Sequence, residues 1–212
     1  AVAQDFLNFV GDARLVILPG SKATRADLDF FRRQGWDIDL KAHIRAGGYV
    51  LGLCGGYQML GDSIADPEGI EGAPGTSGGL GHLDIATVLT AQKELRIEAA
   101  TSALFGLPLA GYHMHMGATE GSDRVRPFAR VGERDEGAVS ASGRVMGTYL
   151  HGIFASDAFR RAFLERLGIA AAPTLDFAAE VDATLDALAA HLEAYLDLDA
   201  ILALARAVEP RR

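Results

Sequence analysis

The sequence has little cysteine, no excess of positive charge and no long apolar run, and each shortage excludes a class of protein. A single cysteine, Cys54, cannot form an internal disulfide or a cysteine-rich metal site, so it is either a small buried residue or a reactive thiol. Lys and Arg number 20 against 28 Asp and Glu, and this net charge of -8 argues against nucleic-acid binding. No stretch approaches the roughly 18 apolar residues of a membrane-spanning helix, and the first five residues lack the basic start of a signal peptide. We therefore expect a cytoplasmic protein that binds neither nucleic acid nor membrane.

Glycine is abundant, at 25 of 212 residues against a usual fraction of about 7%, which is typical of an α/β enzyme whose site is built from loops. Two short apolar runs, residues 14–18 and 49–53, have the pattern of buried parallel strands. Between them, Thr24 and Asp37 are candidate caps for two helices. The pattern predicts a right-handed crossover and an open, mostly parallel sheet flanked by helices.

The rest of the chain predicts further elements in turn. The glycines and prolines of residues 67–81 predict a surface loop. Residues 85–89 and 109–116 are candidate strands, and residues 137–150 are predicted to form a hairpin. A helix capped by Ser156 or Asp157 follows, and helical spacing of leucines marks the tail from 181 to 207. We expect a domain over residues 1–170 and a helical extension over 171–212 that packs on it.

The most informative segment is 51–58, where a Gly-x-Cys-x-Gly pattern lies between a strand and a helix. A sharp turn there strains the nucleophile's backbone, and Gly52 and Gly56 leave room where a side chain would collide. Cys54 would stand at a helix N-terminus, which favours a thiolate and makes the Gly55 N–H the first oxyanion donor. The alternative is a buried structural cysteine.

A cysteine nucleophile needs a base, and His151 is the favoured candidate because it follows a strand at the sheet edge where sites form. His43 and His191 lie in predicted helices and are better explained by packing or solvation. His113 and His115 alternate along a strand and face one side, which would allow a metal pair. No third ligand has a telling spacing, so we expect no metal and treat His115 as a substrate-facing or core residue.

The second oxyanion donor is expected from the loop at 18–22, where Gly20 permits close backbone approach and Ser21 follows it. Gly-Ser-Lys in this loop lacks the spacing of a phosphate-binding loop. Direct ATP binding by this chain is therefore not expected.

Four segments together resemble the class I (triad-type) glutamine amidotransferases and, more narrowly, their cobyric acid synthase branch. The strand–turn–helix segment around Cys54, called the elbow below, is shared by many enzymes, whereas the four segments in this order are specific. They are Leu18-Pro19-Gly20-Ser21-Lys22 with Ala26-Asp27-Leu28, the elbow from Gly52 to Gly61, the segment Gly111-Tyr112-His113-Met114-His115-Met116-Gly117, and the segment from Gly147 to Phe154.

The resemblance implies that Cys54 hydrolyses glutamine through a γ-glutamyl thioester, with His151 as proton carrier. Gly20 and Gly55 would supply oxyanion amides with Ser21 beside them, and Gln58 would line the glutamine pocket. It also implies delivery of ammonia to an N-terminal synthetase domain or subunit that amidates corrin carboxylates on the way to cobalamin. ATP and Mg would bind only there, so no cofactor is expected in this chain.

Three departures from the family pattern qualify the resemblance. The carboxylate usual two residues after the histidine is replaced by Ile153, as in the cobyric acid and cobyrinic acid diamide synthase branch, which predicts weak stand-alone glutaminase activity. His113 replaces the glutamate of the family's Gly-Tyr-Glu-x-His motif, so no role of that glutamate is carried over to position 113. Tyr112 and His115 of the same segment are secondary site candidates. The chain is also short for the family, and we expect that it lacks the synthetase domain and the first strand of the amidotransferase sheet.

Other functions fit the same elbow. A cobyrinic acid diamide synthase-type domain is the nearest alternative. Another is a cysteine enzyme of the intracellular protease group, although that group places a glutamate near the first strand and none precedes Glu68 here. A third is a binding module that keeps the fold without activity.

Overall fold

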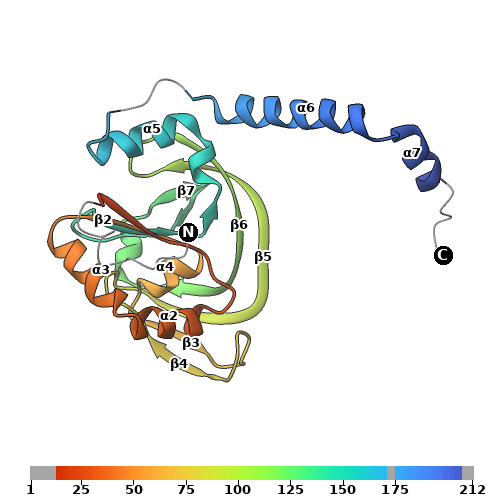
Figure 1. Ribbon diagram of the computed structural model, residues 1–212. Helices are drawn as coiled ribbons and strands as arrows, with labels where there is room; N and C mark the ends of the chain where they lie inside the picture. Colours follow the sequence, from red (N-terminus) through yellow and green to blue (C-terminus); the bar gives the residue numbers. More distant parts are fainter. Residues whose placement is uncertain (1–12, 171–174, 207–212) are drawn as a thin grey trace. The chain divides into compact units, whose positions relative to one another are not determined.

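The computed structural model describes residues 13–170 and 175–206 and divides the chain into two units, Ala1–Ala171 and Ala172–Arg212 (Figure 1). The first unit holds two sheets and their flanking helices. The second holds helices α6 (Phe177–Tyr195) and α7 (Leu198–Arg206). Packing of the tail on the first unit stays a prediction. Within the described residues, no helix has the length and apolar character needed to cross a membrane.

The first sheet is mostly parallel and carries the predicted crossover. Its strands run in the order β1 (Leu15–Leu18), β2 (Tyr49–Leu53), β10 (Val145–Thr148) and β9 (Ala138–Val139). β1 and β10 both run parallel to β2, and β9 pairs antiparallel with β10. The chain passes from β1 to β2 through α2 (Thr24–Arg33) and α3 (Trp36–Arg45), which confirms the predicted order. A strand preceding β1 would lie outside the described residues.

The second sheet is mostly antiparallel, which the sequence patterns did not indicate. Two long strands dominate it, β5 (Ala86–Ser102) and β6 (Pro108–Glu120), and they curve together along one side of the unit (Figure 1). β11 (Leu150–His151) pairs antiparallel with β6, and β3 (Ser63–Asp66) is parallel to β5. β4 (Gly75–Gly78), β7 (Ala129–Val131) and β8 (Arg134–Glu136) complete it. The α/β fold class with open sheets flanked by helices is confirmed.

Local predictions failed where tertiary contacts decide the structure. The segment 67–81 is not all loop, because β4 lies within it and pairs with β3. Thr24 does not cap α2 but begins it after Ala23, and Gly35 rather than Asp37 precedes α3. Ser156 does precede α5 (Asp157–Arg166), yet its hydroxyl accepts a hydrogen bond from Ala110 N instead of capping the helix.

Three short elements follow the strands that lead to the site. α4 (Gly55–Met59) follows β2 directly and is entirely buried. The 3-10 turns η1 (Ser122–Val125) and η2 (Ile153–Ala155) follow β6 and β11. Apolar side chains from β2, β10 and α5, among them Leu51, Met146 and Phe159, pack into one cluster beneath the β10–β11 junction. The carboxyl ends of β2 and β10 are thereby held side by side.

Candidate active site

Cys54 occupies the strained turn that the sequence predicts. Its φ and ψ are 53° and -113°, and among the described residues it is the one non-glycine residue with positive φ. Such a backbone costs on the order of 1–3 kcal/mol and persists only where the surroundings enforce it. Here Cys54 N donates to Thr148 O at 2.9 Å, and Cys54 O accepts from Tyr57 N at 3.0 Å. The strand before the turn and the helix after it therefore fix the thiol in place.

Gly52 and Gly56 allow the close contacts that this turn requires. A Cβ on Gly56 would lie 2.1 Å from Leu18 O, and one on Gly52 would lie 2.6 Å from Gly56 O. Both distances are far below van der Waals contact with backbone atoms that cannot move aside. The predicted reason for the two glycines is confirmed.

Cys54 opens into a cavity of about 570 Å³ between α2, α4 and β6. The cavity brings together most of the predicted site residues and several that were not predicted. Its lining residues are Gly20, Ser21, Lys22, Thr24, Cys54, Gln58, Glu71, Met114, His115, Met116 and His151.

Cys54 and His151 meet in front of the Gly20 loop. A Cβ built on Gly20 would lie 3.9 Å from Cys54 Sγ and 3.7 Å from His151 Cε1. Cys54 directly follows β2 and His151 ends β11, so two separate strands bring these side chains to the same loop. A nucleophile, a base and a loop of backbone amides thus surround the same small volume, as acyl transfer requires.

Burial raises the pKa of the Cys54 thiol above the ordinary value of 9.0. The Gly55 amide lowers it, as expected for a helix N-terminus, but the loss of hydration is larger and the charge of Glu71 adds to it. The expectation of a favoured thiolate is therefore wrong for the unliganded site. The thiol is protonated at neutral pH.

Burial lowers the pKa of His151 below 6.5, and the charge of His113 adds to this effect. The backbone carbonyl of Met114 acts in the opposite direction. Nε2 of the ring is buried and has no hydrogen-bond partner among the described residues. His151 is therefore neutral at pH 7 and able to take a proton.

The Gly20 loop is held by its own side chains. Ser21 Oγ donates to the Asp27 carboxylate, and Ala23 N donates to Ser21 Oγ at 2.9 Å. A Cβ on Gly55 would lie 2.9 Å from Ser21 N, so the loop and the elbow are packed against each other. The amides of both segments thus lie beside Cys54.

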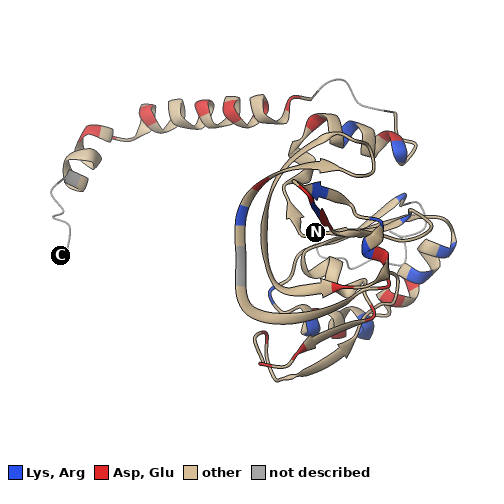
Figure 2. Cartoon of the chain, turned by 180° about the vertical axis from the view of Figure 1, so that it is seen from behind, with Lys and Arg blue, Asp and Glu red and all other residues tan. Residues whose placement is uncertain are grey.

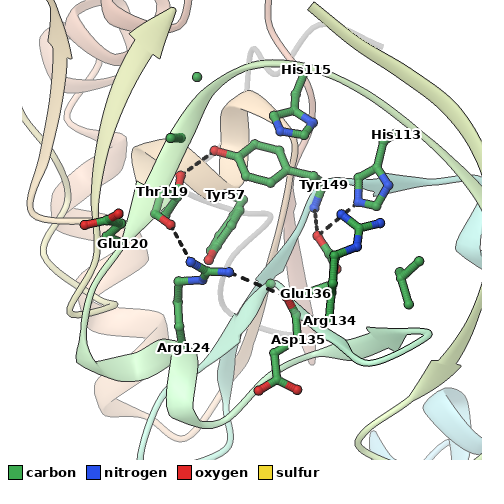
Figure 3. A pocket seen from close by; sticks show the side chains of 14 residues that line it. Tyr57, His113, His115, Thr119, Glu120, Arg124, Arg134, Asp135, Glu136 and Tyr149 are labelled. Atoms are coloured by element: carbon green, nitrogen blue, oxygen red, sulfur yellow. Dashed lines mark hydrogen bonds and ion pairs between the residues drawn. The ribbon is translucent and has the colours of Figure 1, made fainter.

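Gln58 and His115 form the wall behind the cavity. Gln58 Nε2 donates to Met116 O and to Tyr149 Oη, both at 3.1 Å. The ring of His115 stacks on Tyr149 with centroids 3.8 Å apart. Beyond this wall lies a polar cavity of about 230 Å³, where Figure 3 shows Tyr57, Tyr149 and both histidines of β6. Gln58 therefore lines the pocket, and its side-chain amide nitrogen is already hydrogen-bonded to Met116 and Tyr149.

His113 is buried between two carboxylates. Its Nδ1 lies 3.6 Å from Glu98 Oε1, and its Nε2 lies 3.7 Å from Glu136 Oε1. Glu136 also accepts from Tyr149 N at 2.7 Å, as Figure 3 shows. It accepts a further hydrogen bond from Thr148 Oγ1 at 2.5 Å. This cluster fixes the backbone that leads from β10 to His151. His113 and His115 do share one face, with ring centroids 5.7 Å apart.

The remaining candidate residues do not line the cavity. Tyr112 does not line the cavity but stacks on His151. His43 is a packing residue, buried with Nε2 3.0 Å from Tyr49 O. Ile153 is 1% exposed and belongs to the apolar core, so no carboxylate stands at this position.

Sequence reasoning missed Glu71 and Glu136. Glu71 accepts hydrogen bonds from Thr24 N at 2.6 Å and from Thr24 Oγ1 at 3.2 Å, which brings its carboxylate to the cavity. Both residues are isolated in glycine-containing segments without a repeating pattern. Only the folded chain brings Glu71 to the cavity of Cys54 and Glu136 to the backbone that precedes His151.

Comparison with known proteins identifies relatives along most of the chain. Residues 3–159 match the family described as the CobB/CobQ-like glutamine amidotransferase domain. A cobyric acid synthase of Rhodobacter capsulatus is 64% identical over 195 residues, covering 92% of this chain and 40% of that protein. A cobyric acid synthase of Cereibacter sphaeroides is 60% identical, with the same coverage of 92% and 40%. The chain thus spans about 40% of the length of these curated relatives.

A solved structure supports the fold independently. The structure titled "Crystal structure of glutamine amidotransferase" aligns with a TM-score of 0.54 and 22% identity, covering 74% of this chain and 80% of that one. At this identity the likeness shows a shared fold.

Proposed function

The chain belongs to the CobB/CobQ-like glutamine amidotransferase domain family, and from this premise we propose that it is the glutaminase part of a cobyric acid synthase. The observation that carries the proposal is the meeting of Cys54, His151 and the Gly20 loop at one point of one cavity. The family description covers CobB-like and CobQ-like domains alike, so a diamide synthase-type domain stays the nearest alternative.

The first step forms a thioester. Cys54 Sγ attacks the carboxamide carbon of glutamine while His151 takes the thiol proton. The amides of Gly55 and of the Gly20–Ser21 loop stabilise the oxyanion of the tetrahedral intermediate. His151 then returns the proton to the leaving nitrogen, the C–N bond breaks, and ammonia departs from a γ-glutamyl thioester.

The second step regenerates the thiol. His151 takes a proton from water, the hydroxide adds to the thioester carbon, and the C–S bond breaks with return of the proton to sulfur. The products are glutamate and free Cys54. Because thiol and imidazole both start neutral, a thiolate forms only as the carboxamide is attacked, which protects the resting sulfur from side reactions.

The cavity also offers groups for the other end of glutamine. Among its lining residues the charged groups of fixed sign are Lys22 and Glu71. Free glutamine carries an α-carboxylate and an α-ammonium group, which are complementary to this pair. We assign Lys22 to the α-carboxylate and Glu71 to the α-ammonium group.

The substitutions Lys22→Met and Glu71→Gln test this assignment. Each is expected to raise KM for glutamine about tenfold with a smaller change in kcat, because each removes one charge pair. Nα-acetylglutamine, which lacks the ammonium group, provides the control. Its KM should rise in Lys22→Met and change little in Glu71→Gln. An unchanged KM for glutamine in both variants would reject the assignment.

The ammonia is proposed to amidate corrin carboxylates in an ATP-dependent synthetase part, with ATP and Mg bound there. The support is that the named relatives are cobyric acid synthases of which this chain matches about 40%. A cytoplasmic location stays a prediction.

The direct test of glutaminase function is glutamate release from glutamine. The chain is expected to release glutamate slowly, while Cys54→Ala and His151→Ala lower the rate by about a thousandfold or more. Equal release by the chain and by Cys54→Ala would reject the proposal.

A further inference from the structure

The imidazole of His151 needs an orienting group that the triad pattern does not provide. In a triad, a carboxylate holds the ring in a productive orientation. Position 153 offers only a buried isoleucine, 1% exposed in the apolar core. A base whose ring turns freely would lose much of its contribution, because a small misplacement lowers the rate strongly.

The strand β6 lies directly against His151. β11 pairs antiparallel with β6, and this register sets His151 opposite Tyr112. The two rings are stacked, with centroids 5.0 Å apart and planes inclined by 11°. A Cβ on the preceding residue, Gly111, would lie 2.5 Å from His151 O, so only glycine permits this approach of the strands.

We propose that Tyr112 is the positioning residue for the base, in place of the triad carboxylate. This rests on the proposed function. The face of the tyrosine ring limits rotation of the imidazole about its last side-chain bond, and a hydrogen bond to the Met114 carbonyl on the same strand raises the pKa of the ring. The role belongs to the flat ring and not to its hydroxyl group.

Three substitutions separate stacking from packing. Tyr112→Phe keeps the ring, and Tyr112→Leu keeps apolar bulk without a flat face. Ile97→Ala is the matched control, because Ile97 is the cross-strand neighbour of Tyr112 on β5 and is 94% exposed. Tyr112 is itself 39% exposed, so none of the three substitutions leaves a cavity in the core. Thermal denaturation of each variant checks the fold.

The first measurement is steady-state glutamine hydrolysis. Tyr112→Leu is expected to lower kcat about tenfold or more with KM within about threefold, because substrate contacts stay intact while the base is misplaced. Tyr112→Phe and Ile97→Ala should retain kcat within about twofold. A wild-type kcat in Tyr112→Leu, or an equal loss in Tyr112→Phe, would overturn the proposal.

The second measurement does not require glutamine hydrolysis. Cys54 is the only cysteine of the chain, so the rate of alkylation by iodoacetamide at pH 7.5 reports on it alone. His151→Gln is expected to slow alkylation, Tyr112→Leu to slow it equally, and Tyr112→Phe to leave it unchanged. If the chain hydrolyses no glutamine but this pattern holds, the proposed function fails and the positioning stands. If Tyr112→Leu is alkylated like the wild type, the positioning role is rejected.

Discussion

At the residue scale, the protonation of Cys54 and His151 is set more by burial than by the helix that follows the cysteine. α4 has five residues, and its Gly55 amide lowers the pKa of Cys54 less than the loss of hydration raises it. The same loss of hydration keeps His151 neutral. The resting pair is therefore thiol and imidazole, and not thiolate and imidazolium.

This arrangement predicts a broad pH plateau for kcat/KM of glutamine. Activity requires neutral His151, whose pKa is lowered from 6.5, so the acid limb should lie below pH 6.5. It also requires protonated Cys54, whose pKa is raised from 9.0, so any loss from ionisation of the thiol should lie above pH 9. Rates measured from pH 5 to 10 test both limbs. An acid limb centred above pH 6.5 would contradict the assignment of His151.

Local sequence indicated some site residues and not others, for a physical reason. Cys54 and Gly20 come just after strands, His151 ends β11 before Gly152, and the glycines at these turns are a signal in the local sequence. Glu71 is held at the cavity by Thr24, and Glu136 accepts from the Thr148 hydroxyl and the Tyr149 backbone N–H, contacts that exist only after folding. The direction of the Cys54 pKa shift likewise depends on burial that no local pattern encodes.

At the element scale, the parallel strands were predictable and the second sheet was not. The apolar runs that become β1 and β2 are short, branched and bounded by glycine, which specifies buried strands. β4 is the glycine-rich segment Gly75–Gly78, whose strand form depends on pairing with β3. The prediction of the α2 cap was wrong for the same reason. A distant residue, Glu71, accepts the hydrogen bond from the backbone N–H at the start of α2, where Thr24 was expected to be the cap.

The junction of β2 and α4 should be highly sensitive to one added methyl group. Gly56→Ala is expected to lower the free energy of unfolding by about 2–4 kcal/mol, because the new Cβ would collide with Leu18 O. Urea denaturation measures this. Gly78→Ala on β4 is the matched control, since nothing lies within 4 Å of its Cβ, and should change stability by less than about 0.5 kcal/mol. Equal stability of the two variants would contradict the close contact at the elbow.

At the scale of the whole molecule, the second unit carries an unusual helix. α6 contains acidic residues and no Lys or Arg, and Figure 2 shows red but no blue segments along its ribbon. Leu185, Leu188 and Leu192 recur at spacings of three and four residues, and α6 has no buried residue. Such an apolar stripe is expected to pack against another apolar surface.

Deletion of residues 172–212 tests the expectation that the tail packs on the first unit. If it does, the melting temperature of the first unit should fall by about 5 °C or more, because three leucines lose their cover. Leu188→Asp in the full chain should give a smaller fall in the same direction. An unchanged melting temperature in both would reject this packing.

The central claim, that Cys54 is acylated by a glutamine carboxamide, is tested most directly with the electrophilic glutamine analogue diazo-oxo-norleucine and intact-mass spectrometry. The account predicts one covalent adduct per chain, located on Cys54 by peptide mapping, formed much faster than with free thiol and prevented by excess glutamine. Cys54→Ala should form none. Labelling of Cys54 no faster than that of free thiol, or undiminished by glutamine, would contradict it.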